Sequence, residues 1–384
     1  MRSSAAAGTQ VRTNHGQRTS LAHATPSPGR HPHHRDAHNE HMTTRGFTSD
    51  NASGAHPAVL AALVATADGH APSYGADAVT AALAERTRDL FGPDAAIFPV
   101  LNGTGANVVA LTALLQRWDA VVATEHAHLA TDESTAPQLV GGIAVRTLPA
   151  PGGRLAPEDL AALLEAQDGS VHHARPAALT LTQSTELGTV YTPAELARLA
   201  DLAHAHGLAV HVDGARLANA AARLGTSLRA LTTDVGVDVL SFGATKNGAL
   251  FGDAVVVTDP ALAEPVARLR KASTQLASKM RFVSAQLLAL LTEDLWRTTA
   301  ARANDAADHL AQRLREDLGI EPAHPVEANA VFLPVPPERL DAVVAEVPVL
   351  PWDRRAGLLR AVCSFDTTEE DVAALVAGLR RTLG

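Results

Sequence analysis

Lysine is scarce in this sequence, and one lysine lies where a nucleophile is expected. Among the 32 Lys and Arg residues of the 384-residue chain, only Lys246, Lys271 and Lys279 are lysines. Lys246 follows an apolar segment in a glycine-flanked turn, SFGATKNG (241–248), whereas the other two lie in helical, charge-bearing segments typical of solvated side chains. A lysine amine in such a turn can condense with an aldehyde to form a Schiff base. We therefore predict that Lys246 is the nucleophile.

A second candidate is the segment HVDGAR (211–216), in which Asp213 ends an apolar run and Gly214 turns the chain. A buried carboxylate there could hold the nitrogen of a pyridine ring protonated by opposite-charge pairing. Arg216 could bind a substrate carboxylate with its planar guanidinium. Taken singly, each residue has a plainer interpretation, a helix-capping aspartate and a surface arginine, and the sequence leaves these open.

A third candidate is NGTG (102–105), which lies between a predicted strand and a predicted helix. Glycines let the backbone approach an anion, and a helix N-terminus offers free N–H groups and the positive end of the helix dipole, so the segment fits a phosphate. The plainer alternative is a routine turn with a threonine cap. An NAD-binding fingerprint is disfavoured, because Val108 stands where the third glycine belongs.

The fourth candidate, EHAHLATDE (125–133), also follows a predicted strand. Its two histidines and nearby acidic residues suggest a metal, but the spacing is not that of HExxH and a third ligand is lacking. We therefore predict no metal site. His126 or His128 can instead stack on a planar cofactor or act as a base.

These four polar clusters follow four predicted strands, and ligands of open α/β sheets bind beyond the carboxyl ends of the strands. Together the clusters offer contacts for a phosphate, a ring nitrogen, an aldehyde and a ring face. Pyridoxal 5'-phosphate (PLP) requires this set of contacts. We predict PLP as the cofactor.

Apolar segments typical of strands alternate with helical segments up to about residue 258. The predicted strands are 95–100, 120–124, 177–183, 208–213, 237–244 and 252–258, and the predicted helices are 57–67, 78–91, 106–117, 157–166, 193–207 and one that ends at 224. This alternation is typical of an α/β fold with a mainly parallel sheet covered by helices on both faces.

The pattern changes after about residue 260. One long helix or two joined helices are expected over 280–317, and further helices and strands are expected over 331–335, 337–346, 358–365 and from Glu369 to the end. The predicted organisation is therefore a large PLP-binding α/β domain (45–260), followed by linking helices and a small α+β domain (261–384).

Residues 1–44 form a predicted extension that is His-rich and broken by prolines, without a periodic apolar face. This composition predicts disorder. The histidines could hold a metal loosely, although a solvated tail is the simpler interpretation, and Met42 is an alternative start of translation.

The composition excludes several classes of protein. A net charge of -9 argues against nucleic acid or an anionic membrane as the main partner. The single cysteine, Cys363, excludes an internal disulfide framework. Because the sequence also has neither an apolar run of membrane-spanning length nor the apolar region of a signal peptide, we expect a soluble cytoplasmic protein.

From residue 47 to the C-terminus, the chain resembles the L-threonine aldolases, which are PLP enzymes of the aspartate-aminotransferase-like fold (fold type I). The motifs that carry the resemblance are FTSDNASGAHP (47–57), SYGAD (73–77), LFGPDAAIFPVLNGTGAN (90–107), HVDGAR (211–216), SFGATKNG (241–248) and LRAVCSFDTTEEDV (359–372). HVDGAR followed by Lys246 is the most specific pair. LTQSTELGTVYTPAEL (181–196) and QLASKMRF (275–282) are similar to the low-specificity bacterial branch.

The resemblance implies roles in holding the cofactor. Lys246 would form the Schiff base with PLP, and Asp213 would pair with the ring nitrogen. The phosphate would be held by Gly103, Thr104 and Gly105. The implied fold is a large domain with a seven-stranded-type, mainly parallel sheet and a smaller C-terminal α+β domain.

The resemblance also implies a histidine stacked on the PLP ring, five residues before a glutamate. Counting back from Glu133 selects His128 for this role and leaves His126 on the substrate side. The chain departs from the family at Asp132, where an aromatic residue is common, and at QSTE (183–186), which replaces Asn-Thr-His. These departures leave the preferred substrate open.

The implied activity is cleavage of L-threonine, L-allo-threonine and related β-hydroxy-α-amino acids to glycine and an aldehyde. Arg216, which also borders the cofactor, and Arg360 would bind the substrate carboxylate with the help of Ser49, while His128, His126 or water would take the β-hydroxyl proton. The family implies a homodimer or homotetramer with the active site between subunits. The alternatives are another PLP enzyme of this fold (a β-eliminating lyase, aminotransferase or racemase) and a non-catalytic binding protein, against which the intact Lys246 argues.

Overall fold

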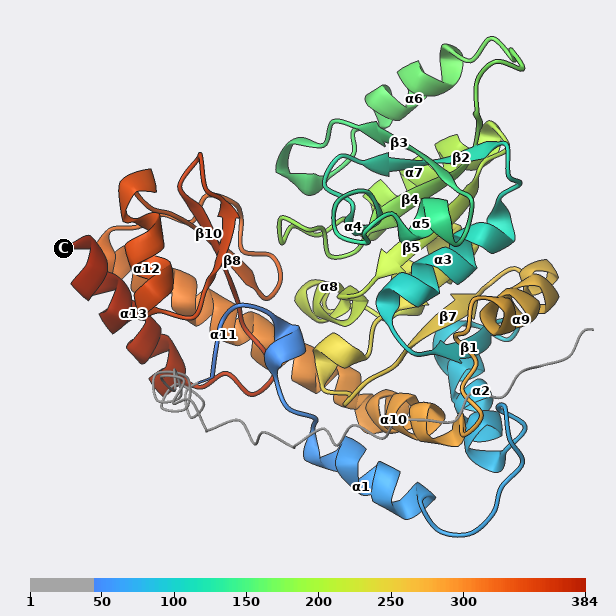
Figure 1. Ribbon diagram of the computed structural model, residues 1–384, viewed down its shortest axis with the longest axis horizontal. Coiled ribbons are helices and arrows are strands. Elements are labelled where there is room, and N and C mark those ends of the chain that lie inside the picture. Colours follow the sequence, from blue (N-terminus) through green and yellow to red (C-terminus); the bar gives the residue numbers. More distant parts are fainter. Residues whose placement is uncertain (1–44) are drawn as a thin grey trace, which may run out of the picture. The chain divides into compact units, whose positions relative to one another are not determined.

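The computed structural model of the protein describes residues 45–384, and the predicted extension over 1–44, with its histidines and Met42, lies outside the described residues. The described part contains one seven-stranded sheet and one three-stranded sheet, each covered by helices (Figure 1). None of its helices is both long enough and apolar enough to cross a membrane.

The larger sheet has the order β1-β7-β6-β5-β4-β2-β3. Its strands are β1 (Ala96–Val100), β2 (Asp119–Thr124), β3 (Ala144–Leu148), β4 (Arg175–Thr182), β5 (Ala209–Gly214), β6 (Val239–Phe242) and β7 (Asp253–Val257). Strand β7 is antiparallel to both of its neighbours, β6 and β1, and the pairs from β6 to β3 are all parallel. Six strands therefore end at the same edge of the sheet, and β7 begins there.

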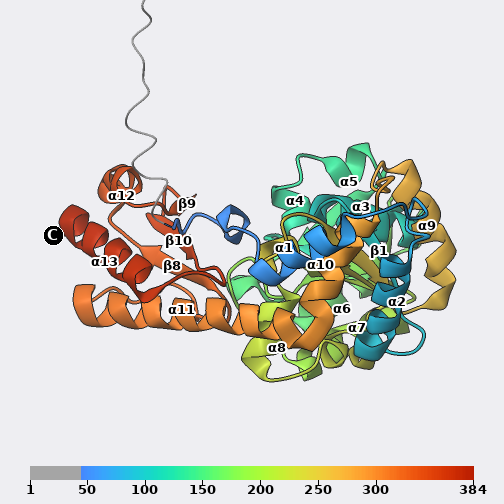
Figure 2. The same ribbon diagram turned by 90° about the horizontal axis from the view of Figure 1, so that it is seen from below.

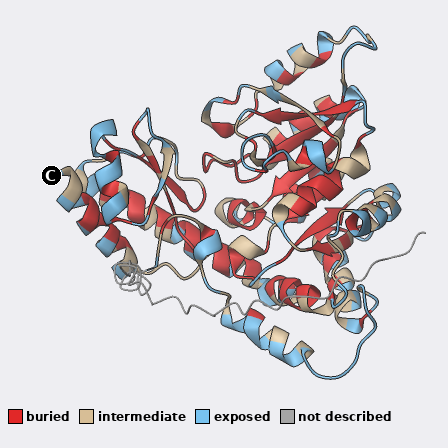
Figure 3. Ribbon diagram, viewed as in Figure 1, coloured by how far each residue is buried: buried red, intermediate tan, exposed pale blue. Residues whose placement is uncertain are grey.

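The central strands are apolar and buried on both faces. Every residue of β2, β6 and β7 is buried, as expected for a sheet that helices cover on both sides (Figure 3). Because side chains alternate between faces, Leu240 of β6 packs into one apolar cluster and its neighbour Val239 into another.

The helices that accompany this sheet are α1 (Pro57–Thr66), α2 (Ala78–Phe91), α3 (Gly103–Leu114), α4 (His128–Thr131), α5 (Ala136–Leu139), α6 (Pro157–Glu165), α7 (Pro193–Ala205), α8 (Leu217–Leu224), α9 (Ala263–Ala272) and α10 (Arg281–Leu291). Helix α3 packs against β5, β6 and β7, while α7 and α8 pack against β5. The sheet is thus the support from which the loops at its carboxyl edge project.

Helix α3 begins three residues earlier than predicted. The Asn102 side chain accepts a hydrogen bond from the Gly105 N–H at 2.8 Å, which caps the helix before Gly103. The cap is therefore asparagine, not threonine. Glycines have low helix propensity, so the sequence pattern placed the start of the helix after them.

The three-stranded sheet belongs to a smaller α+β unit at the C-terminus. It is antiparallel, in the order β8 (Ala330–Pro334), β10 (Leu358–Val362) and β9 (Leu350–Asp353). The helices here are α11 (Leu295–Leu318), α12 (Leu340–Glu346) and α13 (Glu369–Leu383). Helix α11 packs against α8 of the larger unit and against α13, so it joins the two units (Figure 2).

The predicted fold class is confirmed, but two strands (β3 and β9) and three helices (the four-residue α4 and α5, and α9) were missed. Strand β3 lies at the edge of its sheet and has no buried residue, so it lacks an apolar run. Strand β9 is also an edge strand, and it contains Pro351. Helix α9 has four charged residues among its ten, AEPVARLRKA, so the sequence shows no clear apolar face there. The expected helical segment over 280–317 is two helices, α10 and α11.

Gly243 allows the turn after β6 to approach the turn after β5 closely. It follows β6, and its N–H donates to the carbonyl oxygen of Gly214 at the end of β5. A Cβ atom at Gly243 would lie 2.4 Å from the carbonyl oxygen of Ala215 and 2.6 Å from its Cα. Because the obstacle is backbone, it cannot rotate away, and the two turns would have to separate.

We predict that Gly243→Ala lowers the free energy of unfolding by about 1–3 kcal/mol, the usual cost of overpacking. The control is Gly54→Ala, since a Cβ at Gly54 meets no atom within 4 Å. Thermal denaturation of both variants and of the wild type measures the effect. Equal melting temperatures for all three proteins would contradict the prediction.

Candidate active site

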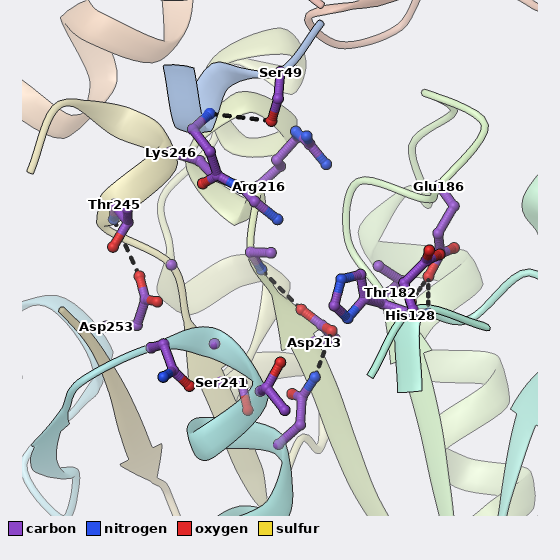
Figure 4. Close-up of a pocket in the computed structure, with 18 of the residues that line it drawn as sticks. Ser49, His128, Thr182, Glu186, Asp213, Arg216, Ser241, Thr245, Lys246 and Asp253 are labelled. Atoms are coloured by element: carbon purple, nitrogen blue, oxygen red, sulfur yellow. Dashed lines mark hydrogen bonds between the residues drawn. The ribbon is translucent and has the colours of Figure 1, made fainter. Parts of the chain in front are cut away.

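A cavity of about 860 Å³ opens at the carboxyl edge of the larger sheet. Its walls come from the segments that follow β1, β2, β4, β5 and β6, and from β9 and β10 of the smaller unit. Its volume is in the range of pockets that hold a cofactor or small ligand. The labelled side chains of Figure 4 converge on this cavity from different parts of the chain.

The predicted site residues meet at this cavity, with one exception. The residues that line it are Ser49, Gly103, Thr104, His126, His128, Asp213, Arg216, Lys246 and Arg360. Gly105 is not in the wall, because its N–H is bonded to Asn102 and a Cβ there would lie 2.3 Å from the Gln275 side chain. The structure thus makes Gly105 a packing position under the cavity.

Asp213 is a buried carboxylate at the end of β5, with 6% of its surface exposed. Its Oδ2 atom accepts a hydrogen bond from Asn107 Nδ2 at 2.9 Å, and its Oδ1 atom accepts one from the Ala215 N–H at 3.0 Å. Burial alone would raise the pKa of Asp213, but the Asn107 hydrogen bond and the charges of His211 and Lys246 outweigh burial and lower it. Asp213 is therefore held in its charged form.

Asn107 connects Asp213 to the loop after β2. Its Nδ2 atom also donates to Glu133 Oε1 at 2.7 Å, and the same oxygen lies 2.9 Å from His128 Nδ1. The Glu133 hydrogen bond raises the pKa of His128, against the effect of partial burial. His128 is thus fixed at one ring nitrogen. For His126, the contact with an acidic group within residues 45–384 is the 3.8 Å one with Glu125.

Lys246 lies in a single 3₁₀ turn (Thr245–Asn247) that follows β6. The buried Asp253, at the start of β7, shapes this turn by accepting the backbone N–H groups of Ala244 at 2.8 Å and Thr245 at 3.1 Å. Burial, together with the positive charge of Arg216, lowers the pKa of Lys246. A lowered pKa favours the neutral amine, which is the nucleophilic form.

Arg216 is not a surface arginine. Its side chain is only 15% exposed, and it forms a two-pronged ion pair with Asp50, Nε to Oδ2 at 2.7 Å and Nη2 to Oδ1 at 2.9 Å. Asn329 Nδ2 also donates to Asp50, at 3.1 Å. Burial alone would raise the pKa of Asp50, but the charges of Arg216 and Lys246 outweigh it and lower the pKa. The pair holds Arg216 in place at the cavity.

Arg360 reaches the cavity from β10 of the smaller unit. Its guanidinium carbon lies 4.8 Å from the ring centre of Trp352, and within the described residues its buried Nε has no hydrogen-bond partner. Burial and the neighbouring charge of Arg216 lower the pKa of Arg360 to about 10. A half-buried arginine whose Nε donor is unused offers a place for an anion.

Ser49 approaches from a short turn near the start of the described chain. Ser49 lines the cavity, and its Oγ atom accepts the Asn51 N–H at 3.1 Å. The same turn supplies Asp50, the ion-pair partner of Arg216, although the two residues are far apart in the sequence.

Glu186 is the cavity residue whose role was missed, although QSTE (183–186) was recognised as a departure. Its Oε1 atom accepts hydrogen bonds from the His128 backbone N–H at 2.9 Å and from Thr182 Oγ1 at 2.7 Å. Burial raises the pKa of Glu186 to about 7. Asn107 and Asp50 were also missed: Asn107 lies inside a helix, and Asp50 precedes its partner by more than 160 positions.

The described residues contain no group of three or more His, Cys, Asp or Glu side chains that could hold a metal ion. His126 and His128 therefore have no third ligand within residues 45–384.

Sequence comparison relates the chain to known enzymes. The model of the family described as beta-eliminating lyase matches residues 46–336. The low specificity L-threonine aldolase of Pseudomonas sp. (strain NCIMB 10558) is 40% identical over 339 residues, which cover 88% of this chain and 97% of that protein. The enzyme of the same name from Pseudomonas aeruginosa is 39% identical over 343 residues, which cover 89% of this chain and 99% of that protein.

Solved structures agree with this relationship. The threonine aldolase of Leishmania major has a TM-score of 0.82 and 28% identity, and covers 88% of this chain and 99% of its own. The aspartate aminotransferase of Thermus thermophilus has a TM-score of 0.62 at 20% identity, over 88% and 90% of the chains, and supports the fold alone. The large and small units are those of fold type I PLP enzymes.

The residues of the cavity fit PLP. The first-turn N–H groups of α3 at Gly103 and Thr104 are not used inside the helix, and both residues line the cavity. A side chain at Gly103 would project toward Asp253, with its Cβ 3.7 Å from Oδ2, and would narrow that space. Asp213 supplies a fixed negative charge for a protonated ring nitrogen, and Lys246 supplies an amine for the aldehyde.

The Asp50–Arg216 pair yields a stability prediction. Asp50→Asn leaves the buried Arg216 without its counter-charge, so the free energy of unfolding should fall by about 3–5 kcal/mol. The control is Asp234→Asn, whose ion pair with Arg229 has both side chains 48% exposed. This exposed pair should contribute less than about 1 kcal/mol.

Urea denaturation at fixed protein and cofactor concentration measures both changes. Equal losses in the two variants would contradict the proposed importance of the buried pair.

Proposed function

The chain belongs to the beta-eliminating lyase family, and we propose that it is a low-specificity L-threonine aldolase. In this proposal it cleaves L-threonine, L-allo-threonine and related β-hydroxy-α-amino acids between Cα and Cβ, and releases glycine and an aldehyde. Its cofactor is PLP. The enzyme class is therefore a lyase that acts on a small amino-acid substrate.

One observation carries the proposal: Lys246, Asp213 and Arg360 line a single cavity, although they come from two strand ends of the large unit and one strand of the small unit. An amine, a charged carboxylate and an arginine with an unused donor are the groups that a PLP enzyme of amino-acid metabolism needs. The two Pseudomonas aldolases, which match almost over their whole length, support the choice of reaction.

The cofactor-binding residues act as follows. Lys246 would hold the cofactor through its side-chain amine. Asp213 would place its fixed negative charge at the ring nitrogen, Gly103 and Thr104 would hold the phosphate, and His128 would lie against the ring. When bound, PLP accepts the electron pair that bond cleavage leaves on the substrate Cα.

The substrate-binding residues hold the carboxylate. Arg360 binds it through the donors that its surroundings leave unused, and Arg216, fixed by Asp50, binds it from the other side with the help of Ser49. A carboxylate held at two points orients Cα so that the Cα–Cβ bond is the one that breaks. His126 lies toward the side chain of the substrate.

The protein acts as a homodimer or homotetramer with the active site between subunits. Phe251, which lines the cavity, is 41% exposed, and its neighbour Leu250 is 54% exposed. Helix α1 also exposes Leu60 and Val64, at 43% and 75%. A second copy that covers these apolar side chains would also close the cavity. The proposed compartment is the cytoplasm, and the buried, unpaired Cys363 is compatible with reducing conditions.

Product analysis tests the function. The PLP-loaded protein is incubated with L-threonine and L-allo-threonine, and glycine and acetaldehyde should accumulate in equal amounts. Release of ammonia and a keto acid would identify an eliminating lyase. A reaction that requires an amino acceptor would identify an aminotransferase, and formation of the inverted amino acid would identify a racemase. Any of these results without aldehyde would contradict the proposal.

A further inference from the structure

The cavity contains one carboxyl oxygen that the functions above leave unused. Glu186 lines the cavity, and its Oε1 atom already accepts two hydrogen bonds, whereas Oε2 is buried and has no hydrogen-bond partner within the described residues. A buried polar atom without a partner is costly in a folded protein unless a ligand satisfies it. The position of Oε2 therefore indicates a contact with something that enters the cavity.

The other carboxyl groups of the cavity wall have partners. Asp213 accepts bonds from Asn107 and Ala215, and Asp253 accepts two backbone N–H groups of the Lys246 turn. Asp132 is exposed and accepts the Thr131 hydroxyl at 2.8 Å. Both N–H groups bind Oδ1 of Asp253, and its Oδ2 is not among the fully buried atoms. Among the carboxyl oxygens of the cavity wall, Glu186 Oε2 is the one that is fully buried and has no hydrogen-bond partner within the described residues.

Glu186 lies across the cavity from the nucleophile. In Figure 4, Lys246 and Thr245 lie on the left, while Glu186, Thr182 and His128 are grouped on the right, with Asp213 and Arg216 between the two groups. The amine of a β-hydroxy amino acid goes to the Lys246 side and its carboxylate to the arginines. The β-hydroxyl is the polar group of the substrate that remains without a partner.

We propose that Glu186 is the catalytic base that takes the proton of the β-hydroxyl group, an inference that rests on the aldolase function proposed above. The proton passes to Oε2, the O–H electron pair becomes the second carbonyl bond of the aldehyde, and the Cα–Cβ pair remains on Cα. Glu186 then loses its proton to water, and Cα takes one up before glycine leaves. No oxidant, reductant or co-reactant is consumed.

The charges around Glu186 suit this role. The groups around it are Asp213 from the end of β5 and Arg216 just after that strand, His128 at the start of α4, and Tyr191 from the segment that follows β4. Burial first and the negative charge of Asp213 second raise the pKa of Glu186 to about 7, against the hydrogen bond from Thr182. A base is most effective when its pKa lies near the working pH.

His128 is the competing base, and its surroundings disfavour it. Its Nδ1 atom lies 2.9 Å from Glu133 Oε1 and is occupied by that contact, which also raises the pKa of His128. Glu186 Oε2, in contrast, has no partner within the described residues. His128 is therefore better suited to lie against the ring than to act as the base.

The test uses Glu186→Gln in the PLP-loaded protein. Glutamine keeps an amide oxygen for the His128 N–H and the Thr182 hydroxyl, but it cannot take a proton. The kcat for cleavage of L-threonine should fall about 10²–10⁴-fold, the usual contribution of a general base, with unchanged PLP content and a similar KM. The wild-type kcat should fall as the pH drops through about 7 and Glu186 becomes protonated, and Glu186→Gln should lack this limb.

A second reaction in the same cavity separates chemistry from folding. Exchange of the glycine α-proton with deuterium in heavy water, followed by NMR, uses PLP, Lys246 and the arginines but involves no β-hydroxyl. Glu186→Gln should exchange glycine at close to the wild-type rate. The matched control is Glu125→Gln: Glu125 also accepts a backbone N–H, that of Ala150 at 3.1 Å, but its side chain is 50% exposed and does not line the cavity. It should leave both reactions unchanged.

Two results would overturn the inference and leave the aldolase function intact. One is cleavage by Glu186→Gln within about threefold of the wild type, and the other is an equal loss of cleavage and glycine exchange, which would mean a structural role. A wild-type protein that exchanges glycine but releases no aldehyde would instead overturn the proposed function, and this inference with it.

Discussion

A buried carboxylate that stays negatively charged is the constraint on which the rest of the site depends. Burial opposes the charge of Asp213, so the protein must supply compensating groups, and it does so with the Asn107 amide and nearby positive charges. The same amide binds Glu133, which in turn fixes His128. One side chain of α3 therefore links Asp213, the proposed partner of the ring nitrogen, to His128, which is proposed to lie against the ring. The N-terminus of the same helix is the proposed phosphate site.

The smaller unit is connected to the site through a second buried charge. Asn329, just before β8, donates to Asp50 and also to the carbonyl oxygen of Cys363 at 2.7 Å, and Asp50 holds Arg216. Arg360 enters from β10 of the same unit. The substrate carboxylate would thus be held by one arginine from each unit, so the position of the small unit determines whether both can bind at once.

The sequence predicts the parts of the site that depend on residue type at a strand end. Asp213 lies at the end of one apolar strand and Lys246 follows another. Because parallel strands bring their carboxyl ends to one edge, the meeting of the two residues in one cavity follows from the fold class. Asn107 could not be found in this way, because it lies within a helix without a motif. The free oxygen of Glu186 also depends on three-dimensional contacts, since its partners come from β4 and from the loop after β2. Edge strands such as β3 were missed because few of their residues are buried. Such strands need few apolar residues, so the sequence shows no apolar run there.

The charge of Asp213 is tested most directly by Asp213→Asn, which keeps the shape of the side chain and removes its charge. The variant should retain PLP on Lys246, seen as an unchanged cofactor content after borohydride reduction and peptide mapping. Its turnover of L-threonine should fall about 10²–10³-fold, the scale of a lost electrostatic partner in a buried site. Turnover close to that of the wild type, with PLP still bound, would contradict the account, because another group would then have to keep the ring nitrogen protonated.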